Sequence, residues 1–277
     1  MDKLTEKEIL QRFAIGDSFV GMDFRSLNLQ RAVLNGADLS NVDFRGTNLR
    51  GANLSNTNLS NANLSNTILS EANLRSANMS GANISDSYLV ESRMYGVDLS
   101  GADLTSANMS GAFITGEANL DEANLVGANL RRVNLSEGSM RKTDFTVAYM
   151  RRINLSNSDL TGAVLNGARL NGANLEKALL NGAQLRETIL DASNMDFARL
   201  DNADLSKASM VSCSLFNASL QMATLVETIL TASNFEDADL TLANFTGAKL
   251  RGSVILTANT KWTDFSETDL DERFSKD

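Results

Sequence analysis

Two residue types that commonly perform catalysis, His and Cys, are absent or nearly absent from this chain. It contains no His, so the usual general base at neutral pH and the commonest transition-metal ligand are missing. Its single cysteine, Cys213, lies two residues before Leu215. At that spacing it replaces a small residue of a repeated pattern, so we expect a buried, inert thiol. One cysteine permits no disulfide within the chain, which fits a reducing compartment, and we predict a cytoplasmic location.

The carboxylates and glycines are numerous, but their spacing does not predict a reactive site. Acidic residues such as Asp38 and Asp98 precede an apolar residue and are predicted to point outward, without a partner for acid–base work. Glycines such as Gly162 and Gly167 form neither a GxxxxGK[ST] phosphate loop nor a GxGxxG motif between a strand and a helix. We therefore predict a protein that is not an enzyme, with no catalytic, cofactor-binding or metal-binding residues.

A five-residue unit recurs almost without interruption from Phe19 to Leu270. The unit consists of a small residue, Asn or Asp, a large apolar centre, and two polar or small residues. The segment 51–55, Gly-Ala-Asn-Leu-Ser, shows its form, with Ala52 as the small residue and Leu54 as the centre. A helix would scatter centres five residues apart around its axis, and a flat strand would send them to alternate faces. If the two residues after each centre turn the chain, every unit can face inward. Four sides then close a coil of 20 residues, and coils stack as a solenoid.

One extra residue enters the repeat at residues 115–117, Thr-Gly-Glu, before the next unit resumes at Leu120. Gly116 permits a corner bulge that keeps the following coils in phase. A short functional loop is the alternative.

This sequence resembles the pentapeptide-repeat family, whose consensus is a small residue, Asn or Asp, Leu or Phe, and then polar or Gly positions. The resemblance covers nearly all of residues 19–270, and residues 13–16, Phe-Ala-Ile-Gly, running into Asp23-Phe24 are similar to the entry of cyanobacterial members. It implies an all-β solenoid, a right-handed quadrilateral β-helix with Leu and Phe centres along its axis. The family is functionally diverse, so the repeat itself implies architecture and not activity.

The first residues depart from the repeat. Thr5 followed by Glu8 predicts a capping box, and Leu4 with Ile9 a hydrophobic staple. Apolar residues at helical spacing and a Gly stop predict a short amphipathic α-helix within residues 5–16. We expect it to cap the first coil, and an additional dimer contact through three of its side chains is a second hypothesis. These are Ile9, Leu10 and Phe13.

We accordingly predict an N-terminal capping helix in residues 1–16, one elongated β-helix in residues 17–270 and a tail in residues 271–277. Trp262 and Phe265 are expected to close the last coil, with the tail as a frayed or helical lid.

Charged clusters are the remaining candidates for binding. With 20 residues per coil, Arg131 and Arg132 should stack over Arg151 and Arg152 on one edge, as solvated surface or as a contact for phosphate or an acidic partner. Residues 187–277 contain 15 acidic against 7 basic residues. That excess serves solubility or forms a surface that fits a basic groove.

These features favour a rigid, non-enzymatic scaffold that holds an unidentified protein partner, with a regulatory role as one hypothesis. The alternative is a DNA mimic that binds a type II topoisomerase such as gyrase, as quinolone-resistance members of the family do. The net charge of −9 disfavours direct nucleic-acid binding. No apolar run reaches membrane-spanning length, and no signal peptide is visible in residues 1–8. Ice binding is a distant third, because Thr does not fill repeated outward columns.

Overall fold

Each five-residue unit forms one side of a coil in the computed structural model, which describes residues 5–270. In the unit centred on Leu54, the side chains of Ala52 and Leu54 are fully buried, whereas Asn53 between them is partly exposed. This alternation is that of an extended segment with one face inward. It confirms at this unit the predicted placement of the small and apolar residues.

The two residues after each buried centre turn the chain. The Ala52 N–H donates to the Leu49 carbonyl oxygen at 3.0 Å, and Gly51 inside that turn has a φ of 63°. Positive φ at the third residue of a β-turn favours Gly and then Asn, because a Cβ is strained there. Those residues recur at the corners for this reason, although Arg31 and Glu71 also adopt the conformation.

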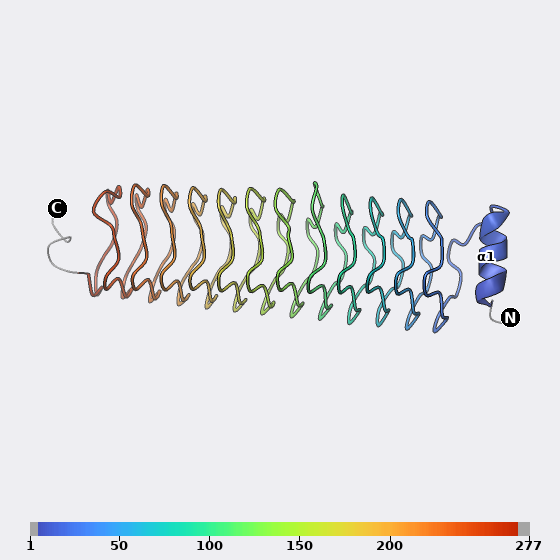
Figure 1. The fold of residues 1–277 in the computed structure, drawn as a ribbon. Helices are drawn as coiled ribbons and strands as arrows, with labels where there is room; N and C mark the ends of the chain where they lie inside the picture. The colour runs from blue at the N-terminus through green and yellow to red at the C-terminus, as the bar shows by residue number, and fades with distance from the viewer. Residues whose placement is uncertain (1–4, 271–277) are drawn as a thin grey trace. The chain divides into compact units, whose positions relative to one another are not determined.

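Successive coils are joined by single-residue parallel bridges between equivalent positions, such as Asn53 with Asn73 and Asn58 with Asn78. The Leu54 N–H donates to the Asn73 carbonyl oxygen at 2.8 Å. Four ladders of bridges start five residues apart along the chain, which confirms the predicted length of the coil (Figure 1). Within residues 5–270 the backbone forms no longer strand, and α1 (Glu6–Ala14) is the one helix.

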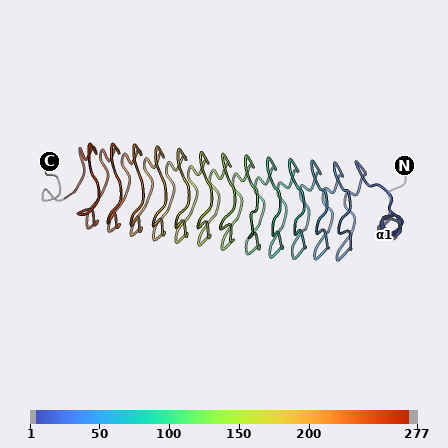
Figure 2. The same ribbon diagram turned by 90° about the horizontal axis from the view of Figure 1, so that it is seen from above.

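The coils group into two compact units, Met1–Asn134 and Leu135–Asp277. The first unit begins with α1, and the described part of the second consists of coils (Figure 2). The division predicted from the sequence, into residues 1–16, 17–270 and 271–277, stays a prediction. Its last segment lies outside the described residues.

The capping box of α1 is confirmed. The Glu8 N–H donates to the Thr5 Oγ1 at 3.3 Å, and the Thr5 N–H donates to the Glu8 Oε2 at 2.7 Å. At the other end the Gly16 and Asp17 N–H groups donate to the Phe13 and Arg12 carbonyl oxygens, a pairing that satisfies the last turn of a helix. The predicted staple involves Leu4, which lies outside the described residues.

Aromatic rings link α1 to the first coils. Ile9 is fully buried, and the Phe13 ring stacks on Phe19 with 6.4 Å between centroids. Phe19 contacts Phe24 at 5.5 Å, and Phe24 contacts Phe44 at 5.4 Å, so the predicted contact of Phe24 with Phe44 one coil away is confirmed, with the two rings edge to face. These contacts bury one face of the helix on the apolar interior of the first unit.

The extra residue near 115–117 changes the register of the bridges. Arg93 pairs with Phe113 in the regular register, whereas Asp98 pairs with Asn119, one position further along the chain than that register would give. Gly116 and Glu117 both have positive φ, 75° and 53°, so the insertion is absorbed at one corner, as a bulge would absorb it.

The last described coils of the second unit differ in part from expectation. Phe245 and Phe265 are in contact one coil apart, as predicted, with 5.2 Å between ring centroids and the rings tilted by 32°. The prediction that Trp262 closes the last coil was wrong, because its side chain is 68% exposed. Trp262 lies two residues after the centre position Thr260, so it occupies an outward corner with φ of 58°, and Lys261 Nζ lies 4.0 Å from its ring centroid.

Candidate binding groove of the first unit

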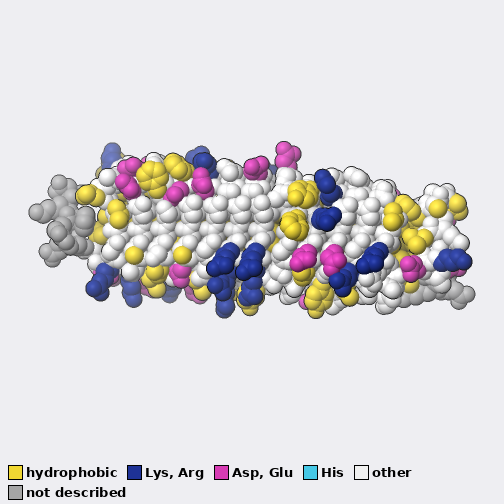
Figure 3. All heavy atoms as spheres, in the orientation of Figure 1, with side chains coloured by type: hydrophobic (Ala, Val, Ile, Leu, Met, Phe, Trp, Pro, Cys, Tyr) yellow, Lys and Arg dark blue, Asp and Glu magenta, His cyan; other side chains and the backbone are white. Residues whose placement is uncertain are grey.

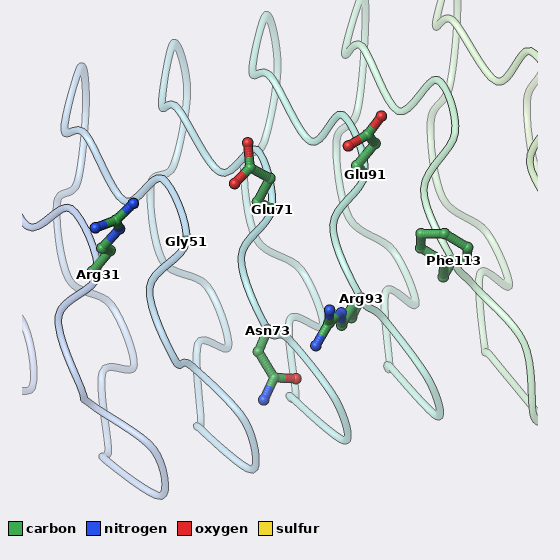
Figure 4. A pocket seen from close by; sticks show the side chains of 7 residues that line it. All are labelled: Arg31, Gly51, Glu71, Asn73, Glu91, Arg93 and Phe113. Carbon is green, nitrogen blue, oxygen red and sulfur yellow. The ribbon is translucent and has the colours of Figure 1, made fainter.

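The first unit carries a surface groove of about 670 Å³ (Figure 4). We call it the 31–113 groove, after the first and last residues that line it. Its lining side chains come from successive coils, and most of them are polar or charged. They are Arg31, Gly51, Glu71, Asn73, Glu91, Arg93 and Phe113.

Two parallel columns of residues build the groove. Arg31, Gly51, Glu71 and Glu91 occupy the same corner of consecutive coils, each with positive φ. On the adjoining side, Asn53, Asn73, Arg93 and Phe113 follow one another as bridge partners. Because stacked backbones lie about 4.8 Å apart, each column presents one side chain per ~4.8 Å.

Gly51 opens the corner column. A Cβ built at Gly51 would lie 3.5 Å from Arg31 Cγ, in ordinary contact, so a side chain there would occupy space beside Arg31. The floor nearby is fixed, since Asn73 Nδ2 donates to Asn53 Oδ1 at 3.1 Å. The groove is therefore held open by a missing side chain between ordered neighbours.

The charges of the groove are partly uncompensated. Glu71 pairs with Arg50, whose Nη2 lies 2.6 Å from Glu71 Oε1. Within the part of the chain that the structure describes, Arg31, Glu91 and Arg93 form no ion pair. Phe113 adds an apolar surface, with 52% of its side chain exposed. Two cations, one anion and an aromatic ring are thus available to a ligand.

The side chains of α1 predicted to contact a second copy do not lie together. Ile9 is fully buried and Phe13 packs on Phe19, inside the first unit. Leu10 instead lines an outward hollow of about 420 Å³ with Glu6, Lys7, Gln11 and Ala14. A dimer contact through this helix stays a prediction, and Leu10 is the member placed to make it.

The predicted basic edge falls in both units. Arg131 and Arg132 belong to the first, and Arg151 and Arg152 to the second, so their stacking stays a prediction. All four side chains are exposed. On the face shown in Figure 3, acidic and basic side chains are interspersed with broad uncharged areas.

Cys213 is buried, as expected from its place in the repeat. Its Sγ donates to the Leu190 carbonyl oxygen at 3.0 Å. Burial raises the pKa of the Cys213 thiol to about 12. A thiol held this way is protonated at neutral pH and is not a nucleophile.

Among the described residues, no group of three His, Cys, Asp or Glu side chains is placed to hold a metal ion. No helix in that part of the chain has the length and apolar character that crossing a membrane requires.

The residues of the 31–113 groove were not predicted from the sequence. A signal was available, because writing the sequence in rows of 20 aligns Arg31, Gly51, Glu71 and Glu91 in one column. The repeat itself gives no sign of this column, since all four residues lie two after a Leu centre, where any polar or small residue fits the unit.

The sequence matches the profile of the family described as pentapeptide repeats, in overlapping stretches that together span residues 18–255. Among solved structures it is similar to HetL, a pentapeptide repeat protein involved in heterocyst differentiation regulation from the cyanobacterium Nostoc sp. strain PCC 7120. The two share 30% identity over 94% of this chain and 96% of HetL, with a TM-score of 0.25.

Two further structures are similar. Rfr23 from the cyanobacterium Cyanothece 51142 shares 28% identity over 32% of this chain and 60% of Rfr23, with a TM-score of 0.32. Full-length QnrB1, a plasmid-mediated fluoroquinolone resistance protein, shares 18% identity over 94% of this chain and 96% of QnrB1, with a TM-score of 0.23. The curated proteins contain no significant match.

Proposed function

The chain belongs to the pentapeptide-repeat family, and on that premise we propose that it is a non-enzymatic scaffold that binds a protein partner through the 31–113 groove. The observation that carries the proposal is the set of unpaired charges, Arg31, Glu91 and Arg93, beside the exposed ring of Phe113. Aromatic residues and Arg are the residue types enriched at protein–protein interfaces.

The backbone supports this role by fixing the positions from which the side chains project. Glu71, Arg93 and Phe113 each donate their N–H to a carbonyl oxygen of a neighbouring coil, at 3.0, 2.9 and 2.9 Å. A partner then meets a surface whose backbone loses little conformational freedom on binding. The proposal includes the right-handed, four-sided coil that the family implies, and a cytoplasmic location. Because HetL is involved in regulation, a regulatory role for the complex is part of the same proposal.

Affinity capture with mass spectrometry tests the scaffold function. Tagged wild-type protein is compared with a variant in which Glu91→Lys and Arg93→Glu reverse both charges on one coil. We expect a protein that is enriched by the wild type and lost from the variant. Recovery of no specific partner from lysate of the source organism contradicts the proposal.

Topoisomerase binding is a second candidate, favoured by the 15 acidic against 7 basic residues of positions 187–277. An acidic surface of this kind competes with DNA for a basic groove. The test is DNA supercoiling by purified gyrase with added protein. Unchanged supercoiling at micromolar protein excludes this function, whereas inhibition that weakens with added salt supports it.

A second copy of the chain is a further proposed partner. Its contact would use the outward hollow beside Leu10, and Leu10→Glu would then shift the sedimentation of a dimer to that of a monomer. A wild-type protein that sediments as a monomer at high concentration removes this proposal.

A further inference from the structure

We infer that the 31–113 groove binds an extended peptide segment of six or seven residues, with an acidic residue near one end, an oppositely charged pair near the other and an apolar residue beyond that pair. This inference rests on the proposed scaffold function and specifies the chemistry of the partner.

The length of the groove sets the length of the segment. From Arg31 to Phe113 the lining residues span five consecutive coils, which at about 4.8 Å per coil is about 19 Å. An extended chain covers that distance with about six residues at ~3.4 Å each. A helix would need about 13 residues, at ~1.5 Å each, to cover the same distance.

The charges set the pattern of the segment. Arg31 lies at one end of the groove, so an acidic residue of the peptide would pair with it there. Glu91 and Arg93 lie on one coil near the other end, so a basic and an acidic residue side by side in the peptide would pair with them. Glu71 already pairs with Arg50, so the middle of the groove needs no charged ligand.

Phe113 sets the apolar position. Its half-exposed ring ends the groove beyond Arg93, where an aliphatic or aromatic side chain would cover it. Burying such a side chain against the ring provides affinity that charge pairs in water do not.

Recognition is through side chains and not through an added β-strand. The N–H groups of Glu91, Arg93 and Phe113 already donate to Ser110, Ala72 and Ser92 carbonyl oxygens at 3.4, 2.9 and 2.9 Å. An added strand needs free backbone donors, so sequence selectivity should come from charge and from the apolar anchor.

The chain offers a substitution that fills the groove at a backbone conformation which residues with side chains adopt elsewhere in the same column. Gly51→Arg places a long side chain between Arg31 and Glu71, at a corner conformation that Arg31 itself adopts with φ of 61°. Gly101→Arg is the matched control: it lies in the same unit at φ 61°, with no atom within 4 Å of a built Cβ, and it does not line the groove. Both variants carry the same added charge.

A random heptapeptide display library panned on purified full-length protein tests the inference. We expect wild type and Gly101→Arg to enrich peptides with the stated charge and apolar pattern, and Gly51→Arg to bind the enriched peptide about tenfold or more weakly in fluorescence anisotropy. Circular dichroism melting of each variant verifies folding. The inference is overturned if no such pattern is enriched, or if Gly51→Arg and Gly101→Arg bind equally.

The same pair of variants separates this inference from the scaffold proposal. If Gly51→Arg still captures the specific lysate partner, the partner binds elsewhere and only the peptide inference fails. If no lysate partner is recovered but the peptide pattern is enriched, the inference that the groove binds a peptide is supported and the proposed scaffold function fails.

Discussion

In some units the backbone N–H that usually donates to the unit's own Asn or Asp donates to a side chain of another coil. In most units the Asn or Asp before the centre accepts the N–H two residues later, as Asn234 does from Glu236 at 2.9 Å. Where Ser214 replaces that residue, Asp196 of the preceding coil accepts the Phe216 N–H at 3.1 Å and the Ser214 hydroxyl. The same carboxylate arrangement recurs for Asp191 and Asp201. An irregular residue is thus compensated one coil away.

This compensation predicts a loss and a specific rescue. Asp196→Ala removes the acceptor of the Phe216 N–H, and we expect the free energy of unfolding to fall by about 1–3 kcal/mol in urea denaturation. Ser214→Asn in the same chain should recover most of it, because its amide oxygen then takes the role that Asn234 has.

Glu236→Ala is the control, since Glu236 occupies the equivalent position and its carboxylate has no hydrogen bond among the described residues. Equal losses for Asp196→Ala and Glu236→Ala would contradict the explanation, as would a failure of Ser214→Asn to rescue.

Cys213 predicts a pH dependence. Because burial raises its pKa to about 12 from 9.0, the unfolded chain loses the thiol proton first as pH rises. Stability contributed by the buried thiol is present below pH 9 and is lost toward pH 12, at about 1.4 kcal/mol per pH unit.

Cys213→Ser should remove this loss with little change at neutral pH. Ser193 and Ser233 make the equivalent bond in the same column, to the Leu170 and Met210 carbonyl oxygens. Chemical denaturation of both proteins at pH 7.5 and pH 10 measures the difference. Parallel losses in wild type and variant would exclude Cys213 as the cause.

At the scale of elements, α1 is a helix of nine residues whose ends are satisfied locally. Helices this short are marginal in water unless caps and packing support them. Ile9 and Phe13 supply the packing, and Thr5 with Glu8 supplies the cap. The element therefore depends on a few named contacts, which makes it sensitive to single changes and to pH.

Acid should loosen the start of α1. Hydrogen bonds from the Thr5 N–H and hydroxyl lower the pKa of Glu8 below its ordinary 4.5. A lowered pKa means that the stabilisation is present above the unfolded value and is lost as pH falls through the folded value. Backbone chemical shifts of residues 6–14 should move toward coil values below that pH. Glu8→Gln keeps an acceptor for the box and should flatten the pH dependence; an unchanged profile would reject the role of Glu8.

At the scale of the whole molecule, the five-residue period was enough to predict the length of the coil, the inward pairs such as Ala52 with Leu54, and the bulge at Gly116. These features follow from a pattern repeated many times, so a few units that depart from it do not change the prediction. The 31–113 groove could not be predicted with the same reasoning, because its lining residues come from two columns of outward positions whose residue types the repeat leaves variable. Trp262 was predicted to be buried because it is apolar, but its position two residues after the centre Thr260 places it at an exposed corner.

Because the chain forms two compact units, we predict that two spectroscopic probes respond differently to a destabilising substitution in each unit. In stacked repeats, stability comes from each repeat and its neighbours, so a local loss spreads over a limited distance. The sole Trp, Trp262, belongs to the second unit, and its ring lies 4.0 Å from Lys261 Nζ, so we expect its fluorescence to change when that unit unfolds. Leu54→Ala in the first unit and Leu205→Ala in the second each remove a fully buried side chain, at about 2–5 kcal/mol.

We expect Leu205→Ala to lower the guanidinium midpoint of Trp262 fluorescence. Leu54→Ala should leave that midpoint nearly unchanged while it broadens the far-ultraviolet circular dichroism transition, which reports on both units. Each variant is the control for the other, because the same Leu-to-Ala change is made at the same position of the repeat. If both variants shift the fluorescence midpoint by the same amount, the chain unfolds as one cooperative unit, and nearest-neighbour stacking does not limit how far a defect spreads.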